Sequence, residues 1–239
     1  MITGLLLDVD DTLIDTRAAM VAAGQAAVAQ LWPSSGVQAQ HAAGVHFHGD
    51  PSGFFGRFTR GEMSFEQMRA ARVADLLGSF ALGATEDVNG RFEAAYAVAF
   101  AVNVRLFDDV LAMLEAAGAA GIPIGLLTNS SSQYTQQKLE ITGLAGAFAS
   151  VATRDSLGFG KPDPRAFHHA CLLLGSAPAE TVYVGDDLEI DAIAARRAGL
   201  SGAWLRREPT DLPGAARAAA LDIPVVTSLS QVPALWAGH

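Results

Sequence analysis

The sequence predicts an α/β protein in which helices cover both faces of a parallel sheet and one helical segment is inserted. Two observations lead to this fold class. Short apolar runs alternate with Ala- and Leu-rich helical stretches from Phe107 onward, which is the pattern of strands joined by crossover helices. Between the first apolar run and that region lies a segment with helical patterns and no convincing buried strand.

The first strand is expected at Leu5–Leu7, where a short apolar run ends at Asp8. The later strands are expected at Pro123–Leu127, Val182–Val184, Ala203–Leu205, Pro224–Val226 and, more weakly, Phe148–Val151. The helices between these runs are predicted at Asp109–Ala120, Ser132–Ile141, Pro164–Leu174 and Leu188–Ala198. We therefore expect the chemistry to lie just beyond the carboxyl ends of the strands, where parallel sheets bind ligands.

The inserted segment is predicted to be helical. Helical patterns at Arg17–Leu31, Ser64–Leu77 and Thr85–Ala101 are separated by turn-rich stretches at Trp32–Gly36 and Gly49–Gly56. We expect residues 1–15 and 106–239 to form the α/β core and residues 16–105 to form a separate, all-helical cap domain.

Composition excludes several classes of protein. The net charge is −9 and the isoelectric point is near 5.0, so the chain lacks the excess of cations that binding to a nucleic-acid polymer requires. The single cysteine, Cys171, excludes an internal disulfide and a multi-cysteine metal site. Neither a secretory signal nor an apolar run of about 18 residues is visible, so we expect a cytoplasmic protein without a membrane span.

The first strand ends in a group of acids. Asp8, Asp10 and Asp11 place three carboxylates within four residues, an arrangement that is electrostatically costly unless a cation lies among them. Oxygen ligands alone favour a hard ion such as Mg²⁺. Asp is also common in turns after strands, so this segment by itself leaves both interpretations open.

Two further predicted strand–helix units carry polar groups suited to an anion. Thr128 and Asn129 follow the run at Ile124–Leu127, beside a helix N-terminus that either binds an anion or is only capped by serine. Lys161 lies in the stiff segment Gly158–Pro164, which lacks the glycine spacing of a P-loop. Such a lysine is either solvated or fixed in position for a ligand.

The run Val182–Val184 is followed by Gly185 and Asp186, with Asp191 about one helical turn further on. Asp187 and Glu189 are explained by the preference for acids in the first turn of a helix, but Asp186 at the strand tip is not. All four segments fall at ends of predicted strands, so together they predict one edge with several carboxylates, a lysine and a hydroxyl. This set is suited to a divalent cation and a phosphate.

These motifs resemble those of the haloacid dehalogenase superfamily, in the phosphatase-like branch with a helical cap inserted after the first motif. Asp8 to Leu13 is similar to the first motif, Thr128 to the second, Lys161 to the third, and Gly185–Asp187 with Asp191 to the fourth. The resemblance covers the whole chain and implies a Rossmann-like three-layer core. One departure is Asp11, which stands where glycine is frequent in the family.

The resemblance implies a Mg²⁺-dependent phosphatase that hydrolyses a small phosphorylated metabolite. Asp8 would attack phosphorus to form an aspartyl-phosphate, and Asp10 would protonate the leaving oxygen and then activate water. Thr128 and Asn129 would bind the phosphoryl group and Lys161 would offset negative charge. The resemblance also implies that Asp8, Asp186 and the main-chain carbonyl of Asp10 hold Mg²⁺, with Asp191 and Asp187 in support.

The inserted segment is expected to select the substrate. Arg57 and Arg60, in a turn-rich stretch, are candidates for gripping an anionic substrate. The same region contains three histidines and an acid: His41, His46, His48 and Asp50. Their spacing matches no standard zinc site, so we expect the histidines to face solvent or substrate instead.

Three alternatives use related residues. A haloacid dehalogenase of the same superfamily shares Asp8 and Lys161 but lacks an acid at the position of Asp10, so Asp10 favours a phosphatase. A phosphosugar mutase keeps both aspartates and stays open. A receiver-type signalling domain needs a phospho-accepting Asp after a middle strand, and Asp50 follows no buried run.

Overall fold

The computed structural model describes residues 1–83, 86–208 and 211–237. They divide into two compact units, one formed by residues 1–15 and 105–239 and the other by Thr16–Val104. We call these the sheet unit and the helical unit. Thr85, at which one predicted helix begins, lies outside the described residues.

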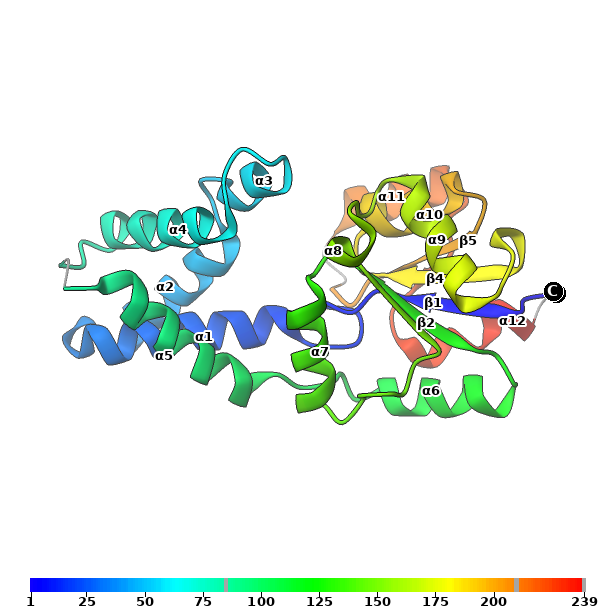
Figure 1. Ribbon diagram of the computed structural model, residues 1–239, viewed down its shortest axis with the longest axis horizontal. Helices are drawn as coiled ribbons and strands as arrows, with labels where there is room; N and C mark the ends of the chain where they lie inside the picture. The colour runs from blue at the N-terminus through cyan, green and yellow to red at the C-terminus, as the bar shows by residue number, and fades with distance from the viewer. Residues whose placement is uncertain (84–85, 209–210, 238–239) are drawn as a thin grey trace. The chain divides into compact units, whose positions relative to one another are not determined.

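The sheet unit contains a six-stranded parallel sheet in the order β3-β2-β1-β4-β5-β6, within the part of the chain that is described (Figure 1). Its strands are β1 (Gly4–Leu7), β2 (Ile124–Thr128), β3 (Ser150–Thr153), β4 (Thr181–Gly185), β5 (Ser201–Leu205) and β6 (Val225–Val226). The chain leaves β1 for β2 on one side and returns to β4 on the other, so the carboxyl end of β1 is the point where strand order reverses.

Helices cover both faces of this sheet, which confirms the predicted fold class. Figure 1 shows α9 and α10 on one face and α6 on the other. The helices of the sheet unit are α6 (Val110–Ala119), α7 (Ser132–Ile141), α8 (Arg154–Leu157), α9 (Pro164–Leu174), α10 (Ala194–Arg197), α11 (Leu212–Ala220) and α12 (Ala234–Ala237). Shorter or wider turns of helix are η2 (Pro178–Glu180), η3 (Leu188–Ile193) and η4 (Leu229–Gln231).

The core of the sheet unit explains why these segments are strands. Leu5, Leu6 and Leu7 are fully buried, as expected for a central parallel strand with helices on both faces. Leu6 packs with Phe167 and Tyr183 in one apolar cluster, in which the free Cys171 is also buried. The strand predicted at Phe148–Val151 is displaced by two residues in the structure, to Ser150–Thr153, because the buried residues of this edge strand, Ala152 and Thr153, are less apolar than Phe148 before it.

The helical unit consists of α1 (Thr16–Leu31), η1 (Pro33–Ser35), α2 (Val37–Gly49), α3 (Phe54–Thr59), α4 (Phe65–Ser79) and α5 (Val88–Asn103). Helices α1 and α2 cross closely at Gly24 and Gly44, where a Cβ on Gly44 would collide with the carbonyl oxygen of Val21. The stretch that contains His46 and His48 was predicted to be rich in turns, and this is wrong: both residues lie in α2. Its weak apolar periodicity hid this helix.

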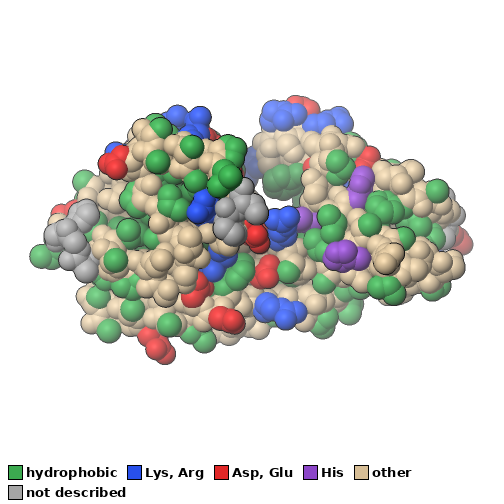
Figure 2. Space-filling view, turned by 180° about the vertical axis from the view of Figure 1, so that it is seen from behind, with side chains coloured by type: hydrophobic (Ala, Val, Ile, Leu, Met, Phe, Trp, Pro, Cys, Tyr) green, Lys and Arg blue, Asp and Glu red, His purple; other side chains and the backbone are tan. Residues whose placement is uncertain are grey.

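Charges are mixed on the one face of the molecule that is drawn in Figure 2. On the face drawn in Figure 2, Lys and Arg side chains lie in small groups near Asp and Glu side chains rather than in one continuous basic surface. None of the helices in the described part of the chain is long and apolar enough to cross a membrane.

Candidate active site

The site begins at the carboxyl end of β1, where the order of strands reverses. Asp8 directly follows the strand, and its backbone N–H donates to the carbonyl of Val184 on β4 at 3.0 Å. The residue is only 5% exposed, so its carboxylate is removed from water. A buried carboxylate at this point needs cationic or hydrogen-bonding partners.

A tight turn after Asp8 holds the other two acids of the first motif. The backbone N–H groups of Leu13 and Ile14 both donate to the carbonyl of Val9, and the N–H of Asp11 donates to the carbonyl of Ile14. Asp11 has a φ of 56°, in the left-handed region that glycine adopts most easily and that Asp tolerates better than most residues. This conformation accounts for an acid at a position where the resemblance leads one to expect glycine.

Thr128 and Asn129 lie at the end of β2. The Thr128 side chain is buried, and its hydroxyl oxygen accepts from the backbone N–H of Ser130 at 3.0 Å. Ser131 then caps α7, because its side chain accepts from the N–H of Tyr134. The serine cap that the sequence left open is therefore present, and it fixes the segment that follows Thr128.

Lys161 brings its ammonium to the first motif. The Nζ atom lies 2.6 Å from Oδ1 of Asp8, 2.7 Å from Oδ1 of Asp191 and 2.8 Å from the hydroxyl of Tyr183. An ammonium has three N–H donors, and these contacts use all of them. Burial lowers the pKa of Lys161, but the carboxylates of Asp191 and Asp8 outweigh it and hold the pKa above its ordinary value.

The backbone around Lys161 is held by the side chain of Asn129. The amide nitrogen of Asn129 donates to the Lys161 carbonyl at 2.8 Å, and the Lys161 N–H donates to the amide oxygen at 2.8 Å. Both ends of this side chain are thus occupied by the Lys161 backbone. The contact makes Asn129 a positioning residue, whereas its binding of substrate stays a prediction.

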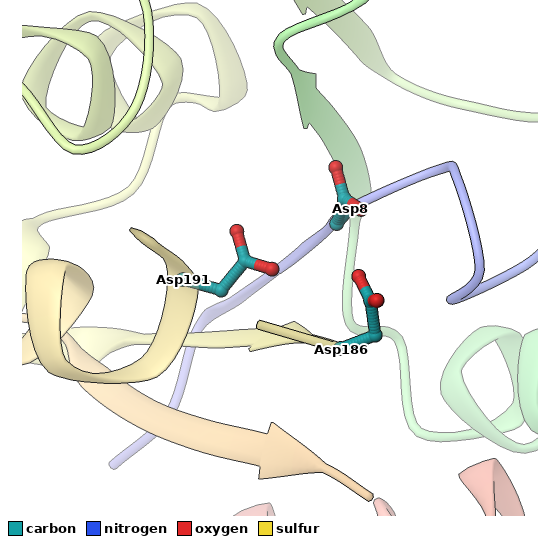
Figure 3. Close-up of side chains that lie close together, drawn as sticks. All are labelled: Asp8, Asp186 and Asp191. Atoms are coloured by element: carbon teal, nitrogen blue, oxygen red, sulfur yellow. The ribbon is translucent and has the colours of Figure 1, made fainter. Parts of the chain in front are cut away.

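Asp186 and Asp191 complete an acidic group with Asp8. One carboxylate oxygen of each residue lies within 4.8 Å of the others, and Figure 3 shows the three side chains converging from β1, the end of β4 and η3. Gly185 permits this approach, because a Cβ there would collide with the carboxylate of Asp191. The donor set consists of oxygens alone and fits a hard divalent cation.

Electrostatics favour a cation among these carboxylates. Burial, together with the nearby charges of Asp8 and Asp191, raises the pKa of Asp186 to about 9. Burial also raises the pKa of Asp8 to about 7, even though the Lys161 ammonium lowers it. Ionising both carboxylates at neutral pH is therefore unfavourable without a cation, and a bound cation would favour their ionised forms.

Asp187 does not point into the acidic group. Its side chain accepts from the backbone N–H groups of Glu189 and Ile190 at 2.8 and 2.9 Å, so it caps η3. Glu189 forms an ion pair with Arg217. Asp187 therefore has the local helix role that the sequence left open as its alternative to metal support, while Glu189 pairs with a side chain of α11.

Two residues near the site were not predicted from the sequence. Lys138 on α7 forms an ion pair with Asp10, and Tyr183 on β4 contacts Lys161. Lys138 lies on a polar helix and resembles a surface lysine, while Tyr183 resembles an ordinary core aromatic. Composition is the signal that could have distinguished Lys138. The chain has only two lysines, Lys138 and Lys161, and uses arginine at all the other Lys or Arg positions.

The candidate residues of the helical unit have local partners. Arg57 and Arg60 both pair with Glu62, and the Arg60 Nε lies 2.6 Å from a carboxylate oxygen of that residue. His46 Nε2 lies 2.7 Å from Asp75, and His41 Nδ1 lies 3.1 Å from Gln25. Within the described residues, Asp8, Asp186 and Asp191 are the one group of three arranged to hold a metal, so the histidines do not form a zinc site there.

Outside the helical unit, His168 on α9 has a structural contact. Its Nε2 atom lies 2.8 Å from the carbonyl of Ala198, at the end of α10. This contact links α9 to the end of α10, which is a structural role for a side chain that is otherwise exposed.

A comparison with family models matches residues 2–199 to a hydrolase family described as haloacid dehalogenase-like hydrolase. The match runs from the strand that positions Asp8 to the helix after Asp191 and includes the whole helical unit. It therefore covers every residue of the site described above.

Among curated relatives, a phosphoglycolate phosphatase of Thiobacillus denitrificans is 31% identical over 83% of this chain and 80% of its own length. A phosphoglycolate phosphatase of Cupriavidus necator is 30% identical over 98% of this chain and 92% of its own. A phosphoserine phosphatase of Thermus thermophilus is 38% identical, but the match spans only 41% of that protein. These relatives support a phosphatase hydrolase.

Solved structures of related fold cover nearly the whole chain. A HAD hydrolase of Bacillus subtilis bound to magnesium has a TM-score of 0.76 at 20% identity and covers 98% of both chains. An L-2-haloacid dehalogenase of Xanthobacter autotrophicus has a TM-score of 0.69 at 20% identity and covers 100% of this chain and 99% of its own. At such identity the likeness establishes the fold.

Proposed function

Because the chain belongs to the haloacid dehalogenase-like hydrolases, we propose that it is a Mg²⁺-dependent phosphatase that hydrolyses a small phosphorylated metabolite through an aspartyl-phosphate on Asp8. The observation that carries this proposal is the position of Asp8, buried at the strand-order switch point with Lys161 at 2.6 Å and two further carboxylates close by.

In the first step a carboxylate oxygen of Asp8 attacks phosphorus. A new O–P bond forms on Asp8 while the bond between phosphorus and the leaving oxygen breaks. Asp10 donates its proton to that oxygen, so the alcohol departs neutral. In the second step Asp10 accepts a proton from water, the water oxygen attacks phosphorus, and the O–P bond to Asp8 breaks to release inorganic phosphate.

Lys161 and Thr128 stabilise the charges of these steps. The Lys161 ammonium touches Asp8 in the resting protein and offsets the charge that gathers as the phosphoryl group arrives. Thr128 lies at the neighbouring strand tip and donates its hydroxyl proton to a phosphoryl oxygen. Asn129 binds the Lys161 backbone and thereby keeps the ammonium beside Asp8. A contact between Asn129 and the phosphoryl group is a further proposed role.

The metal would be held by carboxylate oxygens of Asp8 and Asp186 and by the main-chain carbonyl of Asp10, with Asp191 in support. Mg²⁺ bound there supplies charge neutralisation, so that the anionic nucleophile and the anionic phosphate can approach each other. Asp191 also orients Lys161 and accepts from the backbone N–H of Asp187 at 3.1 Å, so it connects the third and fourth motifs.

The helical unit is proposed to act as a cap that selects the substrate. Arg57 and Arg60 are its proposed anion contacts, and Glu62 holds their guanidinium groups until a substrate replaces it. Two relatives that match over most of their length are phosphoglycolate phosphatases, which favours a short phosphorylated acid over a nucleotide or a sugar.

Asp10 separates this proposal from one of the two alternatives within the family, the dehalogenase. A dehalogenase forms no alkoxide that needs a proton, whereas a phosphatase does. A phosphosugar mutase retains the same two aspartates and is the second candidate. The family match is to hydrolases over most of the chain, which argues against a receiver-type signalling role.

The test is a screen of the purified protein against a panel of phosphorylated metabolites with and without Mg²⁺, scored by free phosphate. We expect Mg²⁺-dependent release of many phosphates per protein, with short phosphorylated acids among the best substrates. Isomerisation of a sugar phosphate without phosphate release would instead identify a mutase. Halide release from a 2-haloacid would identify a dehalogenase.

A further inference from the structure

Lys138 is a buried lysine outside the motifs considered so far, and its ammonium forms an ion pair with Oδ1 of Asp10. The residue is 3% exposed, although lysine is among the residues least often buried. It lies on α7, and 128 positions of the sequence separate it from its partner. The pairing is therefore a product of the fold.

The lysine content of the chain makes this position unusual. The sequence contains only two lysines and uses arginine at all the other Lys or Arg positions. Both lysines are buried, and each contacts one acid of the first motif: Lys161 contacts Asp8, and Lys138 contacts Asp10. No lysine serves as a solvated surface cation, so the compact ammonium is used only beside the two acids proposed to carry the reaction.

The helix that carries Lys138 is fixed to the sheet at its N-terminus. Helix α7 begins directly after the strand that ends in Thr128, and Ser131 caps it. The Ser132 hydroxyl lies 2.7 Å from the hydroxyl of Thr153 at the end of the next strand, which ties the first turn of the helix to the sheet. One strand–helix unit therefore presents both a hydroxyl for the phosphoryl group and an ammonium for Asp10.

An ion pair of this kind restricts a carboxylate. The side chain of Asp10 is about one-third exposed and lies in a tight turn, so the ion pair limits the rotation of its carboxylate toward solvent. An unpaired ammonium at the position of Lys138 is strongly disfavoured, because it is out of water. Each group therefore keeps the other in place.

Resting on the proposed function, we propose that Lys138 is a positioning residue for the general acid/base. It fixes one carboxylate oxygen of Asp10, so the side chain is held in the orientation needed for proton exchange with the leaving oxygen. Lys138 itself does not touch the substrate, because its ammonium is buried against Asp10.

The test compares the leaving-group dependence of kcat/KM in the parent protein and in Lys138→Met. The substrates are p-nitrophenyl phosphate, whose leaving group needs little protonation, and an alkyl phosphate, whose leaving group needs a proton. We expect kcat/KM for the alkyl phosphate to fall by roughly tenfold to a hundredfold, which is part of the contribution of a general acid. We expect kcat/KM for p-nitrophenyl phosphate to fall by less than about threefold. Equal losses on both substrates would overturn the proposal.

A double-mutant comparison covers the case in which Lys138→Met fails to fold. Asp10→Asn combined with Lys138→Met removes both charges, so neither is left unpaired in the interior. If Lys138 acts only through Asp10, the double variant should match Asp10→Asn within about twofold in kcat/KM. A further loss in the double variant would assign Lys138 an independent role and overturn the proposal.

A third measurement is independent of activity. Lysine labelled with ¹³C at Cε should give two side-chain signals in this protein. Asp10→Asn should shift the signal of Lys138 and leave that of Lys161 in place, whereas a shift of Lys161 alone would overturn the pairing. Absence of phosphate release from the parent protein would instead overturn the proposed function, and this inference with it.

Discussion

The Nζ atom of Lys161 lies 2.6 Å from Oδ1 of Asp8, although 153 residues separate them in the sequence. The same nitrogen contacts Asp191 and Tyr183, so one buried ammonium joins the first, third and fourth motifs. This contact places a positive charge beside the attacking oxygen, which reduces the repulsion between the Asp8 carboxylate and an anionic substrate.

Asp8→Asn should abolish phosphatase turnover and leave the fold intact. An amide oxygen is too weak a nucleophile to form the acyl phosphate, so steady-state phosphate release should fall by at least about a thousandfold. The matched control is Asp108→Asn, which changes an exposed acid of the same unit and should retain parental activity. Measurable steady-state turnover in Asp8→Asn would remove Asp8 as nucleophile.

The stability of the metal-free protein should fall as the pH rises. The pKa values of Asp8 and Asp186 are raised in the folded state, to about 7 and about 9, so the stability present near pH 4 is lost as the pH rises through these values. We expect the Tm in a chelating buffer to be lower at pH 9 than at pH 6. A loss of ~1 kcal/mol corresponds to roughly 2–4 °C in a protein of this size.

Mg²⁺ should reverse this trend, because a cation stabilises the ionised carboxylates. The rise in Tm on adding Mg²⁺ should therefore be larger at pH 9 than at pH 6, as scanning calorimetry can measure. Asp186→Asn serves as the control and should flatten both dependences. A metal-free Tm that increases from pH 6 to pH 9 would contradict the electrostatic account of the site.

Much of the site could be predicted because the ends of the strands can be identified in the sequence. Apolar runs mark the parallel strands, and the residues after them, such as Asp8, Thr128 and Asp186, must meet at one edge. Side chains that reach the site from inside an element could not be found in this way. Lys138 depends on the direction in which one face of α7 points, and Tyr183 depends on which face of β4 meets Lys161.

The errors in the fold have similar physical causes. Helix α2 has glycines, histidines and alanines in place of a clear apolar stripe, so its pattern resembled turns. Strand β3 lies at the edge of the sheet and buries only Ala152 and Thr153, whereas the apolar run begins at Phe148, two residues before the strand. Apolar patterns in the sequence predict fully buried strands and helices well, and they predict partly buried ones poorly.

Asn129→Ala should separate positioning from substrate binding. The change removes both hydrogen bonds to the Lys161 backbone and leaves these groups without partners, at a cost of about 1–3 kcal/mol. We expect kcat to fall roughly tenfold with KM changed by less than about twofold, because the ammonium is displaced while binding contacts remain. A rise in KM at constant kcat would show instead that Asn129 binds the substrate. Asn89→Ala, at an exposed asparagine, is the control.

Tyr183→Phe should weaken both the fold and the reaction. The Tyr183 hydroxyl accepts from Lys161 at 2.8 Å and lies 3.1 Å from both the Leu127 carbonyl and Asp191, inside a fully buried environment. Removing it leaves one ammonium proton of Lys161 without an acceptor, which should cost about 1–2 kcal/mol of unfolding free energy in a urea titration. We also expect kcat to fall about fivefold, the equivalent of ~1 kcal/mol, because Lys161 is held less firmly against Asp8.

The matched control is Tyr134→Phe, which removes the same hydroxyl from a side chain on α7 that is 43% exposed. That variant should match the parent protein in both the urea midpoint and kcat, because an exposed phenol exchanges its hydrogen bonds with water. If Tyr183→Phe lowered stability but kept the parental kcat, the hydroxyl would support folding alone. The position of the Lys161 ammonium would then be set by Asp8 and Asp191 without the third contact.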